Sequence, residues 1–128
     1  MHIIRMDHLV ITTQNLSACL AFYGEILGMS IVHVHGRYAV QFGNQKLNIH
    51  TKKAEFLLAA AHPTYGCLDL CFVVDEDIQS VKHVIEAKGY PVEEGPVCRH
   101  GALGAMNSIY LRDPDSNLIE LCSYQAAR

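Results

Sequence analysis

The sequence predicts an α+β fold made of two tandem βαβββ modules, which form a curved mixed sheet with outer helices and a central cleft. Its apolar residues recur at a period of two in some segments and at the helical period of about 3.6 in others. The order strand, helix, strand, strand, strand occurs twice along the chain. One half alone buries little core, whereas two halves side by side can share one sheet that the helices cover.

Length and composition fit a single globular domain. The chain has 128 residues, of which 50% are hydrophobic and 18% are charged. This balance is typical of folded proteins, and one domain usually takes about 100–200 residues. We therefore expect one domain over residues 1–128, with module one at about 1–60 and module two at about 67–125.

Charge and apolar runs argue against several classes of partner. The net charge is −3 without any lysine or arginine cluster, so nucleic acid and acidic membrane surfaces are not expected partners. No apolar run approaches the roughly 20 residues of a membrane span, and the start of the chain does not resemble a signal peptide. The five cysteines form no C-x-x-C pair, which argues against a disulfide framework or structural zinc. We expect a cytoplasmic protein.

Module one begins with an alternating stretch at residues 3–12, which predicts a strand. Asn15 or Ser17 can cap the helix that follows, and Gly28 ends it. A mixed linker is expected at 52–66. The remaining strands of this module are expected at residues 29–35, 38–42 and 46–51.

Module two repeats this order. Asp75 or Asp77 can cap its helix, which ends at Gly89. The Gly-rich stretch at 94–105 predicts a loop over the cleft, and residues 112–117 predict a turn. The strands of this module are expected at residues 67–74, 90–93, 106–111 and 118–124.

Strand periodicity places polar side chains on one face of four strands. Apolar neighbours take the packed face, which leaves a polar set opposite them. Imidazoles and carboxylates that converge in this way suit a divalent transition metal with open positions, so the cleft is expected to be a metal cleft. An exposed strand face shows the same alternation, so no single residue decides the matter. The set is His8, Asn48, His50, Asp69 and Glu120.

Two cationic or titratable residues lie in the predicted Gly-rich loop. Arg99 and His100 could reach an anionic group of a substrate, such as a carboxylate. A solvated loop without a ligand is the alternative. We treat both residues as candidate substrate-binding residues, together with Asn48.

Three motifs, in order along the chain, match those of a known family. They are DHLV at residues 7–10, FYGEILGM at 22–29 and DPDSNLIEL at 113–121. Together they resemble the glyoxalase/bleomycin-resistance/dioxygenase, or vicinal oxygen chelate, superfamily. The stretches 42–50 and 93–97 resemble small glyoxalase-domain-containing proteins, including virulence-associated bacterial ones.

The resemblance implies metal ligands from the first and fourth strands of each module. His8 and Glu120 carry over directly. Asp69 stands where the family usually has histidine, and either Asn48 or His50 stands where glyoxalase I has a carboxylate. We prefer His50, because imidazole is the better transition-metal ligand. The expected set is His8, His50, Asp69 and Glu120 around one divalent ion (Ni, Co, Mn, Zn or Fe).

The resemblance further implies a metal-dependent lyase or isomerase, similar to glyoxalase I (lactoylglutathione lyase). The metal would hold two adjacent substrate oxygens and stabilise an enediolate, and Glu120 or Asp69 would move the proton. Two alternatives stay open. One is an Fe(II) extradiol-type dioxygenase that uses His8, His50 and Glu120; the other is a metal-free protein that binds a drug or metabolite. A homodimer is also implied.

One turn position departs from the family. Ser116 stands where the family usually has glycine. A turn that needs a positive φ would be slightly strained there, at a modest cost in stability.

Overall fold

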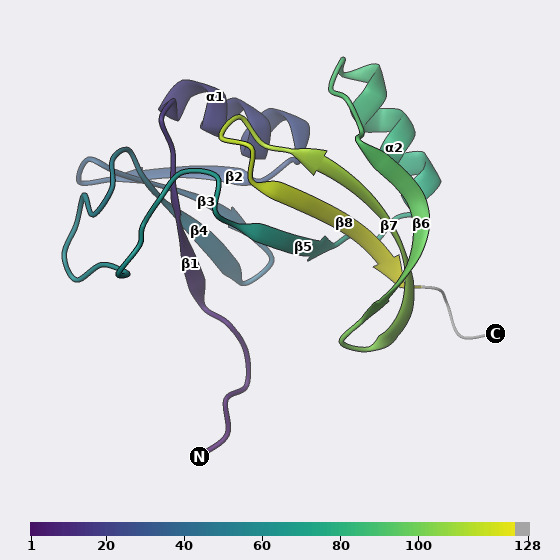
Figure 1. The fold of residues 1–128 in the computed structure, drawn as a ribbon, viewed down its shortest axis with the longest axis horizontal. Coiled ribbons are helices and arrows are strands. Elements are labelled where there is room, and N and C mark those ends of the chain that lie inside the picture. Colours follow the sequence, from purple (N-terminus) through teal and green to yellow (C-terminus); the bar gives the residue numbers. More distant parts are fainter. Residues whose placement is uncertain (125–128) are drawn as a thin grey trace. The chain divides into compact units, whose positions relative to one another are not determined.

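A computed structural model describes residues 1–124 and divides the chain into two compact units, Met1–Cys67 and Leu68 onward. Each unit holds one four-stranded mixed sheet and one helical segment (Figure 1). The predicted α+β architecture of two βαβββ modules is confirmed. Residues 51–68, which join the two sheets, contain neither helix nor strand.

Unit one has the strand order β1-β4-β3-β2, in which β1 runs parallel to β4 and the other pairs are antiparallel. Parallel pairing requires a crossover, and the helical segment supplies it. The elements are β1 (His8–Thr12), α1 (Leu16–Leu20), η1 (Ala21–Ile26), β2 (Ser30–Val34), β3 (Arg37–Phe42) and β4 (Gln45–His50).

The helical segment of unit one covers the apolar face of its sheet. Asn15 caps α1, since its side chain accepts a 3.0 Å hydrogen bond from the Ala18 amide. The predicted single helix is α1 followed by one π-helical stretch, η1. A Cβ added at Gly24 in η1 would lie 3.0 Å from the Ile31 side chain of β2, so helix and sheet pack closely. The core includes Ile11, Tyr23, Val40, Leu47 and Ile49, each at most 2% exposed.

The prediction that the first strand begins at residue 3 is wrong. β1 begins at His8, which pairs with Lys46 near the start of β4. Because the Gly43-Asn44 turn directly precedes β4, residues 3–7 have no β4 residues opposite them with which to pair. Ile3 remains 89% exposed.

Unit two has the same topology, with the order β5-β8-β7-β6 and β5 parallel to β8. Asp77 caps α2, because its carboxylate accepts a 3.1 Å hydrogen bond from the Ser80 amide. Ile78 and Ile85 of α2 are buried, and α2 contacts β6, β7 and β8. The elements are β5 (Asp69–Val73), α2 (Ile78–Ala87), β6 (Glu94–Gly101), β7 (Gly104–Arg112) and β8 (Leu118–Tyr124).

The predicted loop over the cleft at residues 94–105 is wrong, and so is the predicted strand at 90–93. Residues 94–101 form β6, which makes a hairpin with β7. The glycines that suggested a loop serve the hairpin instead. Gly104 follows the tight turn with a φ of 124°, and Gly95 adopts a φ of 108° where the β6 register shifts.

Two further features follow from the described residues. No helix within residues 1–124 is long and apolar enough to cross a membrane. None of the five cysteines, all of which lie within residues 1–124, forms a disulfide, and Cys19 and Cys122 are buried.

Candidate metal- and ligand-binding faces

In unit one, the three polar candidates share one sheet face. Asn48 pairs with Val10 across the parallel β1–β4 ladder, and His50 pairs with Thr12. Because residues two apart on a strand point the same way, His8 lies on this face as well. Leu47 and Ile49 of β4 are 2% exposed on the opposite face. The alternation in the sequence predicted this division correctly.

The His8 imidazole is oriented from one side. Its Nδ1 donates a 2.8 Å hydrogen bond to the Asp7 carboxylate. This hydrogen bond is the main reason that the pKa of Asp7 lies below its ordinary value. Because Nδ1 is engaged, Nε2 is the ring nitrogen available to a metal, the arrangement in which a carboxylate orients a histidine ligand.

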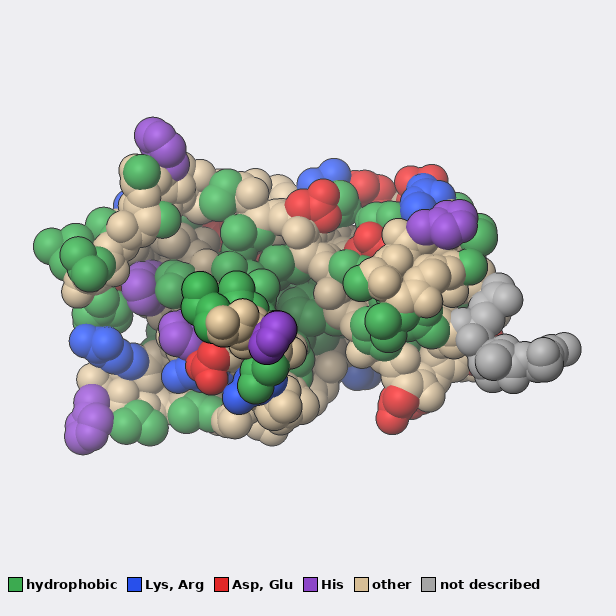
Figure 2. Space-filling model, turned by 90° about the horizontal axis from the view of Figure 1, so that it is seen from below, with side chains coloured by type: hydrophobic (Ala, Val, Ile, Leu, Met, Phe, Trp, Pro, Cys, Tyr) green, Lys and Arg blue, Asp and Glu red, His purple; other side chains and the backbone are tan. Residues whose placement is uncertain are grey.

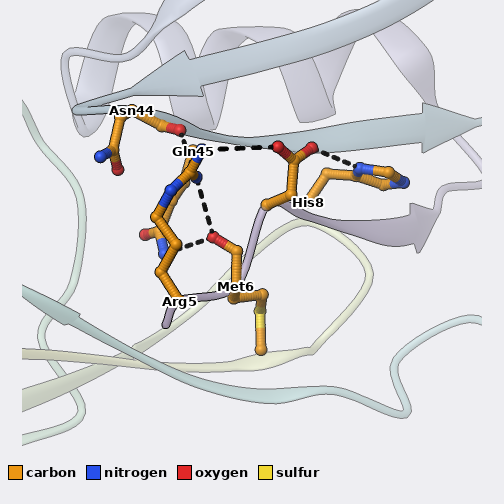
Figure 3. A network of polar contacts seen from close by, with 6 residues as sticks. Arg5, Met6, His8, Asn44 and Gln45 are labelled. Carbon is orange, nitrogen blue, oxygen red and sulfur yellow. Dashed lines mark hydrogen bonds and ion pairs between the residues drawn. The ribbon is translucent and has the colours of Figure 1, made fainter. Parts of the chain in front are cut away.

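The segment that carries Asp7 is tied to the turn before β4. Arg5 donates a 3.1 Å hydrogen bond to the Asn44 carbonyl and lies 3.7 Å from Asp7, while Gln45 donates to the Met6 carbonyl at 3.0 Å (Figure 3). These contacts anchor an exposed stretch of backbone just before His8.

A pocket of about 520 Å³ opens on unit one beside β3 and β4. Asn48 and His50 line it, together with Arg37 and Phe56. Phe56 contacts both Arg37 and His50. The Arg37 guanidinium is 4.0 Å from the Phe56 ring centroid, and the centroids of the His50 and Phe56 rings are 5.1 Å apart in an edge-on arrangement. Figure 2 shows histidine, lysine and arginine side chains on the surface of this unit, at the left of the view.

In unit two, Asp69, Cys71 and Glu120 share one sheet face, since Cys71 pairs with Glu120 across the parallel β5–β8 ladder. The Glu120 carboxylate accepts a 2.6 Å hydrogen bond from the Ser108 hydroxyl of β7. Ser108 is fully buried and Glu120 is half-buried. One oxygen of Glu120 is therefore held in place.

The two thiols on this face, Cys71 and Cys122, favour the protonated form. Desolvation raises the pKa of Cys71 strongly, and the neighbouring Cys122 and Glu120 add to the rise, although the residue as a whole is exposed. Burial likewise raises the pKa of Cys122. Both thiols are therefore weak nucleophiles in the metal-free protein, because the thiolate is the reactive form.

Arg99 and His100 lie on β6, and not in a loop as predicted. Arg99 pairs with Met106 and shares the Glu120 face; its Nε donates a 3.0 Å hydrogen bond to the Tyr110 hydroxyl. Burial raises the pKa of Tyr110. His100 is the next residue along the strand and therefore points to the opposite face.

A buried polar turn sets the start of β8 and hence the position of Glu120. Asp113 accepts hydrogen bonds from the Asp115 amide and the Asn117 amide, each at 2.9 Å, and from the Asn117 side chain at 2.8 Å. The side-chain oxygen of Asn117, Oδ1, accepts a 2.9 Å hydrogen bond from the Leu68 amide, directly before β5. Both parallel strands of unit two thus start from one turn.

The two units repeat the same register on their polar faces. Asn48 lies opposite Val10, two residues after His8, and Glu120 lies opposite Cys71, two residues after Asp69. The repeat therefore equates His8 with Asp69, Asn48 with Glu120, and His50 with Cys122. This match favours Asn48 over His50 as the fourth-strand position of unit one, a choice that the sequence left open.

The predicted metal set draws two side chains from each unit. Within residues 1–124, no three histidine, cysteine, aspartate or glutamate side chains of a single unit are grouped so as to hold a metal. The set of His8, His50, Asp69 and Glu120 stays a prediction. Its donors, imidazole nitrogen and carboxylate oxygen, fit a divalent transition metal.

Sequence reasoning missed several residues on these faces. Ser108 and Tyr110 belong to them because period two along β7 puts both beside Glu120. Arg37 could have been assigned by the same rule, since β3 pairs with β4. No pattern in the sequence indicates that Phe56 of the linker lies over that strand pair.

Comparison with known proteins identifies the fold and the relatives of the chain. Residues 5–121 match the model of the Glyoxalase/Bleomycin resistance protein/Dioxygenase superfamily. The glyoxalase domain-containing protein RDO1 of Mycosarcoma maydis is 48% identical over 124 residues, which cover 96% of this chain and 70% of that protein. Virulence protein STM3117 of Salmonella typhimurium is 46% identical over 121 residues, which cover 94% of this chain and 84% of that protein.

Solved structures agree with this comparison. The crystal structure of STM3117 superposes with a TM-score of 0.94 over 98% of this chain and all of that one. Lactoylglutathione lyase from Agrobacterium tumefaciens, 24% identical, has a TM-score of 0.72 over 93% of this chain and 92% of that one. TnmS3, an antibiotic binding protein from a Streptomyces species, is 20% identical and has a TM-score of 0.75 over 98% of this chain and 99% of that one. The last two likenesses concern the fold alone.

Proposed function

Because the chain belongs to the glyoxalase/bleomycin resistance protein/dioxygenase superfamily, we propose that it is a metal-dependent lyase or isomerase of the glyoxalase I type. Its substrate is a small molecule with two adjacent oxygens. The observation that carries the proposal is the repeated register, which puts a possible ligand at matching positions of both units: His8 with Asn48, and Asp69 with Glu120.

The side chains of this chain supply both ligands and a proton carrier. His8, Asp69 and Glu120 would hold one divalent ion, with either Asn48 or His50 as the fourth ligand. The ion, when bound, would supply Lewis-acid polarisation of the substrate oxygens. Glu120, which accepts a hydrogen bond from Ser108 on one oxygen, would take up a substrate proton, and Asp69 is the alternative base.

Metal content tests the proposal directly. We would measure it by elemental analysis on tag-free protein for wild type, His8→Ala and Glu120→Ala. The matched controls are His83→Ala and Glu86→Ala, since both residues are exposed on α2. About one ion per chain in wild type and the controls, with loss in the two site variants, is expected. If wild type neither contains metal nor takes up Mn, Fe, Co, Ni or Zn on dialysis, the metal-free binding alternative replaces the proposal.

Activity tests the reaction class. The expected result is turnover of methylglyoxal plus a thiol by protein loaded with Ni, Co, Mn or Zn, lost in Glu120→Ala. Oxygen uptake with a catechol and Fe(II), without any thiol-dependent turnover, would instead support the dioxygenase alternative.

The same proposal includes a homodimer and a location in the cytoplasm. The homodimer is supported by large apolar side chains at the surface, among them the chain neighbours Leu57 at 85% and Leu58 at 101% exposure. Contiguous exposed apolar patches, unlike single exposed residues, mark association surfaces. Light scattering after size exclusion is expected to give twice the chain mass of 14.2 kDa. A mass of one chain at micromolar concentration would contradict the dimer.

A further inference from the structure

We propose that the pocket of unit one binds a small organic anion, a carboxylate joined to an apolar group, through Arg37 and Lys46. This names a substrate class for the proposed site and rests on the proposed function only in placing the anion beside the metal. Binding to metal-free protein therefore tests it separately.

The charges that line the pocket are all of one sign. Arg37 and Lys46 are full cations, His35 and His50 are titratable, and no aspartate or glutamate belongs to the lining. Within residues 1–124, neither cation forms an ion pair. Two unpaired cations beside a concave surface attract an anionic ligand and raise its local concentration.

Two carboxylates that neighbour lining residues, Asp7 beside Lys46 and Glu55 next to Phe56 in the chain, are already engaged. Asp7 is hydrogen-bonded to His8 at 2.8 Å, and Lys46 contributes only a minor part to the lowered pKa of Asp7. Both oxygens of Glu55 accept hydrogen bonds from Thr51, one from the amide and one from the hydroxyl, each at 2.8 Å. Neither acid neutralises the two cations of the pocket by a direct contact.

The Arg37 guanidinium is positioned by an aromatic ring. Its Cζ lies over the Phe56 ring, 4.0 Å from the ring centroid, which is a cation–π contact. Its N–H groups point outward along the edges of the plane and can bind a carboxylate by two parallel hydrogen bonds. Phe56 is set in place by the Thr51–Glu55 turn that directly precedes it.

The rest of the lining suits the apolar part of such a ligand. Val32 and Val34 of β2 and Ala39 of β3 line the pocket together with the Phe56 ring. The volume of about 520 Å³ is in the usual range of small-molecule sites, about 300–1,000 Å³. An anion with an aromatic or branched aliphatic group uses both the charges and these apolar walls.

Benzoate is a suitable probe because it combines a carboxylate with an aromatic ring. We would titrate metal-free, chelator-treated, ¹⁵N-labelled full-length protein with benzoate and with its neutral analogue benzamide, and follow the amide chemical shifts. The variants are Arg37→Met and Lys46→Met, with Lys52→Met as the control for general charge, since Lys52 does not line the pocket. Circular dichroism checks that each variant is folded.

Saturable shifts at Arg37, Lys46 and Asn48 with benzoate, binding at least tenfold weaker with benzamide, and a tenfold loss in each pocket variant but not in Lys52→Met would support the proposal. Equal binding of benzamide, unchanged affinity in both pocket variants, or no saturable binding of benzoate would each overturn it. The benzamide comparison uses wild type alone and stands even if a variant misfolds. Metal content decides the proposed function independently of all these outcomes.

Discussion

The Ser108 hydroxyl donates a 2.6 Å hydrogen bond to the Glu120 carboxylate from the adjacent strand of the same sheet. A hydroxyl bonded to an ionised carboxylate at this length is a strong, charge-assisted contact. It holds one carboxylate oxygen of Glu120 in place. Ser108 is therefore a positioning residue for the proposed reaction.

Ser108→Ala is expected to weaken metal binding by about tenfold, since loss of an outer-shell hydrogen bond typically costs 10–100-fold in affinity. Isothermal titration with the metal identified in wild type measures the change. Ser123→Ala is the matched control, because Ser123 is the neighbour of Cys122 on β8 and points to the other face. Unchanged metal affinity in Ser108→Ala would mean either that Glu120 is not a metal ligand or that the Ser108 hydrogen bond does not support it.

The repeated register predicts that Asn48 and not His50 is the counterpart of Glu120. Asn48→Asp restores a carboxylate at this position and is expected to raise metal affinity at least tenfold, because an ionised oxygen binds a cation more strongly than an amide. His50→Ala is expected to change metal affinity less than threefold. The reverse pattern, a large loss in His50→Ala and no gain in Asn48→Asp, would assign the ligand to His50.

Ser116 has a φ of 68°, so its turn position does take the positive φ that glycine adopts most easily. Ser116→Gly is expected to stabilise the protein by about 0.5–1 kcal/mol, because glycine adopts this conformation without a Cβ clash. Urea unfolding measures the effect. Ser123→Gly, in the extended β8, serves as the control and is expected to destabilise. A Ser116→Gly variant less stable than wild type would contradict this account.

Glu55 gives a pH-dependent contribution to stability. Its pKa lies below the ordinary value of 4.5, chiefly because it accepts the hydrogen bond from the Thr51 amide. The stabilisation is therefore present above about pH 4.5 and is lost as the pH falls through the lower folded-state pKa. Since the pair is exposed, the effect is below about 1 kcal/mol.

Thermal melts of wild type and Glu55→Gln from pH 7 to pH 3 test this dependence. Wild type is expected to be more stable at pH 7, and the difference is expected to shrink towards pH 3. Glu86→Gln on the exposed face of α2 is the control. A difference that grows as the pH falls would have the wrong sign for a carboxylate of lowered pKa.

Gly95→Ala is expected to destabilise the protein by about 3 kcal/mol or more, through strain at a positive φ and a clash. The φ of Gly95 is 108°, and an added Cβ would overlap the Ser108 carbonyl and lie 2.9 Å from the Ile109 Cα. Gly43→Ala is the control: its φ is 51°, and no atom lies within 4 Å of the added Cβ. Equal losses in both variants, measured by urea unfolding, would show that crowding at β7 contributes nothing.

Much of the fold could be predicted because local rules and tertiary packing agree. β4 alternates polar and apolar residues from Lys46 to His50, and β8 does so from Ile119 to Leu121, so the faces of these segments were evident from the sequence. β6 was missed because Gly95, Gly101 and Gly104 indicate loop by propensity, whereas pairing with β7 decides the structure. The prediction that β1 starts at residue 3 was wrong for the same reason, because a strand extends only as far as the partner strand with which it pairs.

The candidate site was predictable in part. Period two placed His8, Asn48 and Glu120 on the correct faces of their strands. It also decides that Arg99 and His100 point apart, once both are known to lie on one strand. The ring of Phe56 beside Arg37 depends on how a linker folds back, and no periodic rule describes such a segment.

The parallel pairing of β1 with β4 and of β5 with β8 has a consequence for how the protein is made. In each unit the first strand must wait for the last one, so the sheet closes only when the whole module has left the ribosome. Such long-range closure is slow in comparison with hairpin formation. His8 and its strand remain unpaired through the synthesis of β2 and β3, and a translational pause once residue 50 has left the ribosome would favour correct closure of the first module before the second one emerges.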